Sequence, residues 1–141
     1  MLECFDTRLT KLKQIDCLRL VIAGGREFSN YEILRDACLK VLLKSQWEDI
    51  EIVSGCARGA DVLGERFALE QGFVVKLFPA DWDRFGKAAG MIRNSEMARY
   101  GNVLIAFWDG KSNGTKNMIA EAKQHGCVVF VINYKGEEIV C

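Results

Sequence analysis

The sequence predicts an α/β fold, a doubly wound three-layer sandwich on a mainly parallel sheet of about five strands. Five short apolar runs alternate along the chain with segments of helical periodicity, which is the pattern of repeated β–α units. The runs are nearly continuous in apolar residues rather than apolar at every second position, as strands are when both faces of a parallel sheet are covered. Three of them end in glycine-containing loops. The expected architecture is therefore Rossmann-like.

The length fits a single domain over the whole chain, residues 1–141, because compact domains most often hold about 100–150 residues. Half of the residues are hydrophobic and only one is a proline, which is enough apolar material for one packed core. Residues 18–133 form the expected core of this domain. Residues 1–17 are expected to be an N-terminal extension without an assigned role.

Each strand is predicted from an apolar run that stops at a turn signal. The first run (LRLVIA) stops at Gly24, the second (IEIV) at Ser54, the third (FVVKLF) at Pro79 and the fourth (VLIAFW) at Asp109. The expected strands cover residues 18–23, 50–53, 73–78, 103–108 and 127–132. Residues 136–141 are compatible with a further short edge strand.

The helices are predicted from apolar residues at helical spacing and from signals at their ends. Ser29 and Glu32 fit a capping box in front of a helix whose apolar face covers residues 33–42. Further helices are expected over residues 60–71, 91–100 and 115–124, ended by Gly72, Gly101 and Gly126. Residues 79–90 are expected to be irregular.

The charge balance and the cysteines exclude several classes of protein. With 19 Lys+Arg and 19 Asp+Glu the formal net charge is +0, which argues against bulk electrostatic binding to nucleic acid or to a membrane surface. Residues 1–17 lack the apolar segment of a secretory signal, and no apolar run reaches the ~20 residues of a membrane helix. The six cysteines form no C-x-x-C pair and there is one histidine, so we expect a reduced cytoplasmic protein without a metal site.

Glycines and cationic side chains occur together after three of the strands. The residues concerned are Gly24, Gly25 and Arg26 after the first strand, Ser54, Gly55, Arg58, Gly59 and Asp61 after the second, and Gly110, Gly114 and Thr115 after the fourth. Strand ends of a parallel sheet meet at one edge, where backbone N–H groups and arginine side chains would form an anion site. A single loop of this kind is also what any strand-to-helix turn requires. None of the loops is a dinucleotide fingerprint or a P-loop, which disfavours a conventional NAD dehydrogenase or ATPase.

A later segment adds three candidate ligand-binding residues. Arg93 and Asn94 lie early in a predicted helix, from which Arg93 would contact a phosphate or ribose and Asn94 a hydroxyl or base edge. Trp82 follows a proline-containing turn and would offer a flat surface for stacking a nucleobase. The alternative is ordinary: a solvated helix start and an aromatic side chain that packs in the core.

These segments resemble the SLOG superfamily, named for the Smf/DprA and LOG proteins, and most closely its YspA-like branch. The matching segments are residues 24–28, 54–61, 81–94, 107–110 and 114–115, and the resemblance covers about residues 18–133. The resemblance implies a Rossmann-like sheet, a nucleotide or nucleotide-derived ligand at the glycine loops, and a homodimer. It does not imply a particular activity.

Two better-known branches of this superfamily set the alternatives. LOG enzymes cleave a nucleoside monophosphate at its glycosidic bond with a G-G-x-G-T-x-x-E loop, and residues 114–115 match the G-T. The glutamate position is Met118, which cannot act as an acid or base. Hydrolysis would need a substitute, and the candidate catalytic residues are Asp61, Glu65 and Glu121. Residues 54–59 look like the loop of DprA, which binds single-stranded DNA, but this chain lacks the excess of cations such binding needs.

The leading prediction is a protein that binds a nucleotide or nucleotide-derived small molecule, in a sensor or sequestration role and without a cofactor. The alternative is a hydrolase that acts on an N-glycosidic or phosphate bond of a nucleotide. A single-stranded DNA binder is the third interpretation.

Overall fold

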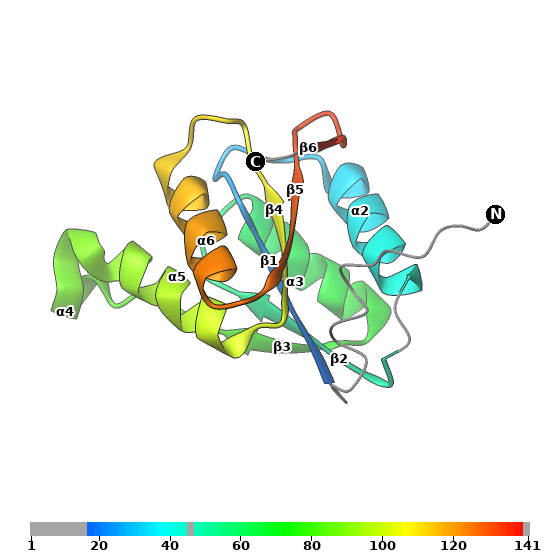
Figure 1. The fold of residues 1–141 in the computed structure, drawn as a ribbon, viewed down its shortest axis with the longest axis horizontal. Coiled ribbons are helices and arrows are strands. Elements are labelled where there is room, and N and C mark those ends of the chain that lie inside the picture. The colour runs from blue at the N-terminus through cyan, green and yellow to red at the C-terminus, as the bar shows by residue number, and fades with distance from the viewer. Residues whose placement is uncertain (1–16, 45–46, 140–141) are drawn as a thin grey trace.

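The structure, a computed structural model, describes residues 17–44 and 47–139 and contains one six-stranded sheet (Figure 1). The strands are β1 (Cys17–Gly24), β2 (Asp49–Ser54), β3 (Val74–Leu77), β4 (Val103–Phe107), β5 (Val128–Ile132) and β6 (Glu138–Ile139). Their spatial order is β3-β2-β1-β4-β5-β6, and every pairing is parallel except that of β5 with β6. The predicted α/β, Rossmann-like fold is confirmed.

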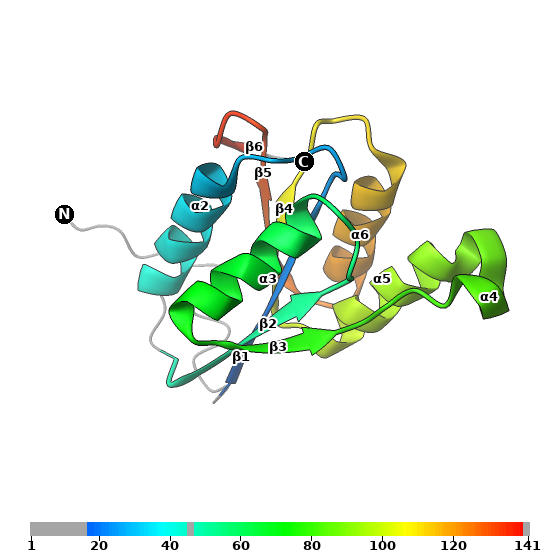
Figure 2. The same cartoon turned by 180° about the vertical axis from the view of Figure 1, so that it is seen from behind.

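The helices are α2 (Tyr31–Leu43), α3 (Ala60–Gln71), α4 (Trp82–Phe85), α5 (Ala89–Tyr100) and α6 (Asn113–Gln124), with a 3₁₀ turn, η1 (Gly86–Ala88), between α4 and α5. Helices α2 and α3 cover one face of the sheet, and α5 and α6 cover the other (Figures 1 and 2). Among the described residues, no helix is both long and apolar enough to cross a membrane.

Alternation along the central strands supplies the core on both faces. In β1, Leu20 and Ile22 pack toward α2 and α3, whereas Val21 packs toward α5 and α6, and all three are buried. Both sides of β1 and β4 are therefore covered, which explains why β4 is apolar at every position and β1 is apolar from Leu20 to Ala23. Because the buried central strands are parallel, the loops that follow them lie together at one edge of the sheet.

The structure corrects several sequence-based boundaries. Cys17 belongs to β1 and not to the extension, while the rest of the extension, residues 1–16, lies outside the described residues. The expected edge strand is confirmed at Glu138–Ile139, and residues 140–141 also lie outside the described residues. The capping box is wrong, because Asn30 and not Ser29 caps α2 by accepting a hydrogen bond from the Ile33 N–H at 3.1 Å.

The segment expected to be irregular contains α4 and η1. Asp81 caps α4, and its Oδ1 accepts from the Arg84 N–H at 3.1 Å, so this aspartate starts a helix that apolar periodicity cannot reveal in four residues. No residue of α4 or η1 is buried, and α4 projects beyond the sheet (Figure 2). Helix α6 begins at Asn113, two residues before its expected start, so Gly114 and Thr115 belong to its first turn.

Candidate functional site

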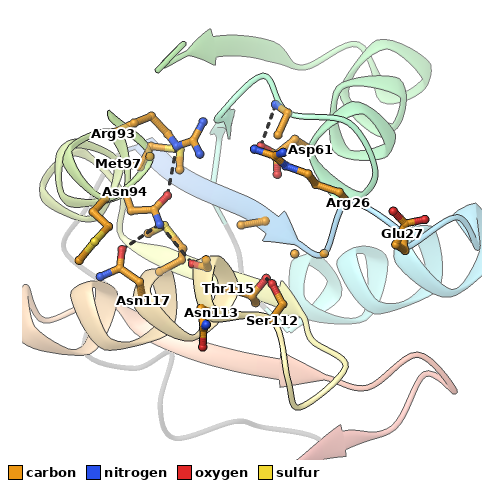
Figure 3. Close-up of a pocket in the computed structure, with 18 of the residues that line it drawn as sticks. Arg26, Glu27, Asp61, Arg93, Asn94, Met97, Ser112, Asn113, Thr115 and Asn117 are labelled. Carbon is orange, nitrogen blue, oxygen red and sulfur yellow. Dashed lines mark hydrogen bonds between the residues drawn. The ribbon is translucent and has the colours of Figure 1, made fainter. Parts of the chain in front are cut away.

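The strand order reverses between β1 and β4, and a cavity opens at the carboxyl ends of these two strands. This cavity, called the crevice below, has a volume of about 600 Å³ and is lined by the loops after β1 and β4 and by α5 and α6 (Figure 3). In open α/β sheets, this reversal point is where ligands bind. The sequence therefore located the crevice by its strand ends.

Two helices begin at the crevice without a side-chain cap. The N-cap residues are Ser112 for α6 and Gly59 for α3, and neither has a side chain that accepts from a backbone N–H of its helix. The first N–H groups of an α-helix have no partner within the helix and carry partial positive charge. Ser112 and Thr115 both line the crevice, so the amino end of α6 faces it. An anion there would find N–H donors already in place.

The loop after β4 is held in shape by Asp109. Its Oδ1 accepts from the N–H groups of Lys111 and Ser112, both at 2.8 Å, and these bonds hold the pKa of its carboxyl below the usual range. Trp108 Nε1 donates to the Ser112 carbonyl at 3.0 Å, which fixes the same turn from the other side. The N-terminus of α6 is therefore presented to the crevice by a constrained loop.

Arg93, on α5, lines the crevice and reaches across to the loop after β2. Its Nη1 donates to the Gly55 carbonyl at 2.5 Å, and its Nε donates to Asn94 Oδ1 at 3.1 Å. The guanidinium has five N–H donors, so other donors remain for a ligand. By contrast, neither Arg26 nor Lys87, which also line the crevice, forms an ion pair with any residue that the structure describes.

Asn94 is buried, and its amide already has partners within the chain. Nδ2 donates to the Gly114 carbonyl at 3.2 Å and to Asn117 Oδ1 at 2.9 Å, so both amide hydrogens are used (Figure 3). The predicted contact of Asn94 with a ligand hydroxyl would have to use its Oδ1, which already accepts from Arg93. The geometry gives Asn94 a positioning role, because it ties α5 to the first turn of α6.

Asp61 is a buried carboxyl in the first turn of α3, with only 5% of its surface exposed. Burial raises its pKa to about 6, although the Ala57 N–H, which donates to Oδ2 at 3.1 Å, and the charges of Arg93 and Arg26 oppose this rise. The Glu65 carboxylate adds a smaller rise to the pKa of Asp61. An acid with such a perturbed pKa at a crevice is a candidate for proton transfer.

The other two acid candidates do not line the crevice. Glu65 accepts a hydrogen bond from Ser54 Oγ at 2.6 Å, and Ser54 Oγ in turn accepts from the Cys56 N–H at 3.1 Å. The hydrogen bonds of Ser54 and Glu65 therefore hold the loop after β2 in shape. Glu121 lies in the last turn of α6, where its carboxylate is 3.8 Å from His125 Nε2.

Two of the predicted glycines lie in close contacts, Gly59 against backbone and Gly25 against the end of a side chain. A Cβ on Gly59, whose φ is +82°, would lie 2.3 Å from the Gly25 carbonyl oxygen. A Cβ on Gly25 would lie 2.0 Å from the Tyr134 hydroxyl. The loops after β1 and β2 therefore touch through glycine, which brings Arg26 and Asp61 to the same wall.

The predicted ligand-binding residues divide into two groups. Those that line the crevice are Gly24, Gly25, Arg26, Asp61, Trp82, Arg93, Asn94, Gly114 and Thr115. Those that do not line it are Ser54, Gly55, Arg58, Gly59 and Gly110. Gly55 and Arg58 line a smaller adjoining hollow, and Gly110 faces open space.

Sequence reasoning missed Glu27, Asn117 and Tyr134, which also line the crevice. Tyr134 follows β5 and packs its ring 5.0 Å from that of Phe28. Because β5 is the neighbour of β4 in a parallel sheet, the residues after it were a usable signal. Asn117 had none, since it lies one turn inside α6. Within the described residues, no group of three or more His, Cys, Asp or Glu side chains could hold a metal.

Comparison with known proteins confirms the family that the sequence resembles. The family described as "YspA, cpYpsA-related SLOG family" matches residues 18–85. The Gene 61 protein of Mycobacterium phage D29 is 38% identical over 122 residues, which cover 82% of this chain and 95% of the phage protein. This chain belongs to the YspA-related SLOG family. No solved structure matches it significantly. The family match ends at residue 85, before α5 and α6. That these two helices line the crevice of this SLOG protein is therefore known from the structure and not from the family match.

Proposed function

We propose that this SLOG protein binds a nucleotide or nucleotide-derived small molecule in the crevice, as a sensor or to sequester it, without a cofactor. The observation that carries the proposal is the meeting of an uncapped helix N-terminus with Arg26, Arg93 and Lys87 in one cavity. Its volume of about 600 Å³ lies in the range of small-molecule sites. Family membership supports a nucleotide-related role.

The orientation of the ligand follows from the lining. A phosphate is proposed to bind at the amino end of α6, between its N–H groups and the side chains of Arg26 and Arg93, because these groups combine positive charge with directed donors. Trp82 also lines the crevice and is half exposed, so its ring is available to stack on a nucleobase. Nucleotides combine an anion with a flat ring and fit this pair of features.

Isothermal titration with a panel of nucleoside phosphates and ADP-ribose-like compounds tests the proposal. At least one compound is expected to bind with submillimolar affinity, and Arg26→Ala is expected to weaken that binding at least about tenfold, because a charge-assisted bond to phosphate is lost. Arg35→Ala on α2, which does not line the crevice, is the matched control. Flat titrations across the panel would refute the proposal.

A hydrolase acting on an N-glycosidic or phosphate bond of a nucleotide is the second candidate function. Asp61 favours it, because a carboxyl with a pKa of about 6 can both donate and accept a proton near neutral pH. Chromatography after incubation with nucleotides would detect cleavage. Turnover that Asp61→Asn abolishes would establish the enzyme, whereas bound but intact ligand supports the sensor.

We also propose that the protein is a homodimer and works in the cytoplasm. Three apolar side chains near one edge of the sheet are more than half exposed: Leu69 on α3, and Val74 and Leu77 on the edge strand β3. A second copy of the chain would cover them. The four described cysteines are free thiols, as suits a reducing compartment. Sedimentation analysis of the wild type and of Leu77→Asp tests the dimer: a monomeric wild type would exclude it.

A further inference from the structure

A second, smaller hollow adjoins the crevice on the side of the loop after β2. It has a volume of about 310 Å³, and its charged lining consists of Arg26, Arg58 and Arg93, without any carboxylate. Pro79 and Trp82 close it on the side of α4. Three arginines without an acid around one hollow indicate an anion site.

The two hollows share a wall. Arg26, Ala57, Trp82 and Arg93 line both of them, so a ligand that touches these residues in the crevice extends directly into the smaller hollow. The carboxylates of Asp61 and Glu27 belong to the crevice side. The smaller hollow is therefore the more electropositive of the two.

Two of the backbone N–H groups beside the smaller hollow are already used within the chain, so the arginine side chains are its main donors for an anion. The N–H groups of Cys56 and Ala57 are already donated, to Ser54 Oγ and to Asp61 Oδ2 respectively. Arg58 is 72% exposed, and its Nη2 pairs with Glu27 Oε1 at 3.0 Å. An ion pair this exposed contributes little, so a ligand phosphate can replace the carboxylate at low cost.

We propose that the ligand occupies both hollows and carries two phosphate groups, one at the amino end of α6 and the other at Arg58, with Arg26 and Arg93 between them. The class is a nucleotide with two phosphates, such as a nucleoside diphosphate or a diphosphate-linked nucleoside, and not a nucleoside monophosphate. This inference rests on the proposed function and specifies the substrate class of the same site.

The test compares AMP, ADP and ADP-ribose, and the same series for the other bases, by isothermal titration with the full chain. At least one compound with two phosphates is expected to bind at least about tenfold more tightly than its monophosphate. Arg58→Ala is expected to weaken binding of the two-phosphate compound at least about tenfold and to weaken binding of its monophosphate much less, because Arg58 lines the smaller hollow and not the crevice. Arg35→Ala is the control, and circular dichroism checks that each variant is folded.

The outcomes separate the two proposals. If monophosphates bind as tightly as their diphosphate counterparts, or if Arg58→Ala weakens both classes equally, the two-phosphate ligand is refuted and the nucleotide site stands. If no compound binds, both proposals fall.

Discussion

Replacing the buried Asp61 with asparagine is expected to make the stability of this protein less dependent on pH. The side chain is 5% exposed, and its pKa is raised from 3.8 to about 6, mainly by burial. The amide of asparagine can still accept the Ala57 N–H, which now donates at 3.1 Å, but carries no charge at any pH. The variant thus removes the titration and keeps the shape.

The size of the effect follows from linkage. A pKa near 6 in the folded state against 3.8 in the unfolded chain corresponds to about 3 kcal/mol for ionising Asp61 within the fold. The folded state holds this proton more tightly, so the contribution of Asp61 to the free energy of unfolding falls as the pH rises through these two values and is constant above them. About 2 kcal/mol of this fall lies between pH 4 and pH 7.

Urea unfolding of the wild type and of Asp61→Asn at pH 4, 5, 6 and 7 measures the effect. The free energy of unfolding of the variant, relative to wild type, is expected to increase by about 2 kcal/mol across this range. Asp36→Asn is the control, because Asp36 is 70% exposed on the surface of α2. A difference between wild type and Asp61→Asn that stays constant from pH 4 to pH 7 would show that the carboxyl is not desolvated.

Two other substitutions test the framework of the site. Gly59→Ala is expected to lower the free energy of unfolding by about 3 kcal/mol or more, because its Cβ would lie 2.3 Å from the Gly25 carbonyl oxygen. Gly72→Ala is the control: it has a similar φ but open space around it, and should cost about 1 kcal/mol. Equal losses of stability in urea unfolding would contradict the predicted clash at Gly59. Asn94→Ala is expected to cost about 1–3 kcal/mol and to weaken nucleotide binding, because it removes the buried amide that donates to Asn117 Oδ1 and to the Gly114 carbonyl. Unchanged stability by thermal melting would argue against the tie between α5 and α6.

Apolar runs and glycine loops were sufficient to predict the strand alternation and the edge at which the site forms. Long buried strands such as β1 can be recognised from the sequence, because covering both faces demands a nearly continuous apolar run. Helix α4 could not be recognised in this way, because its four exposed residues show no apolar periodicity and its start depends on a single hydrogen bond of Asp81. Ends of helices depend on such local bonds more than on composition.

Within the site, residue types were easier to predict than their roles. Asn94 was expected to face a ligand, but its amide is used between two helices, a contact that depends on how α5 and α6 pack. Asp61 and Glu65 are four residues apart on α3, yet only Asp61 lines the crevice, because Glu65 is held by Ser54. Their spacing predicted that both lie on the same side of α3, but which of them faces the crevice depends on tertiary hydrogen bonds.

The hydrogen bonds of Arg93 have a consequence for how the crevice discriminates between anions. They run without a break from the Gly55 carbonyl through Asn94 to Asn117, so the guanidinium is oriented before any ligand arrives. An arginine already held in place loses little further side-chain freedom on binding. Such a wall selects by fit rather than by adapting, so anions of equal charge but different shape should bind with unequal affinity.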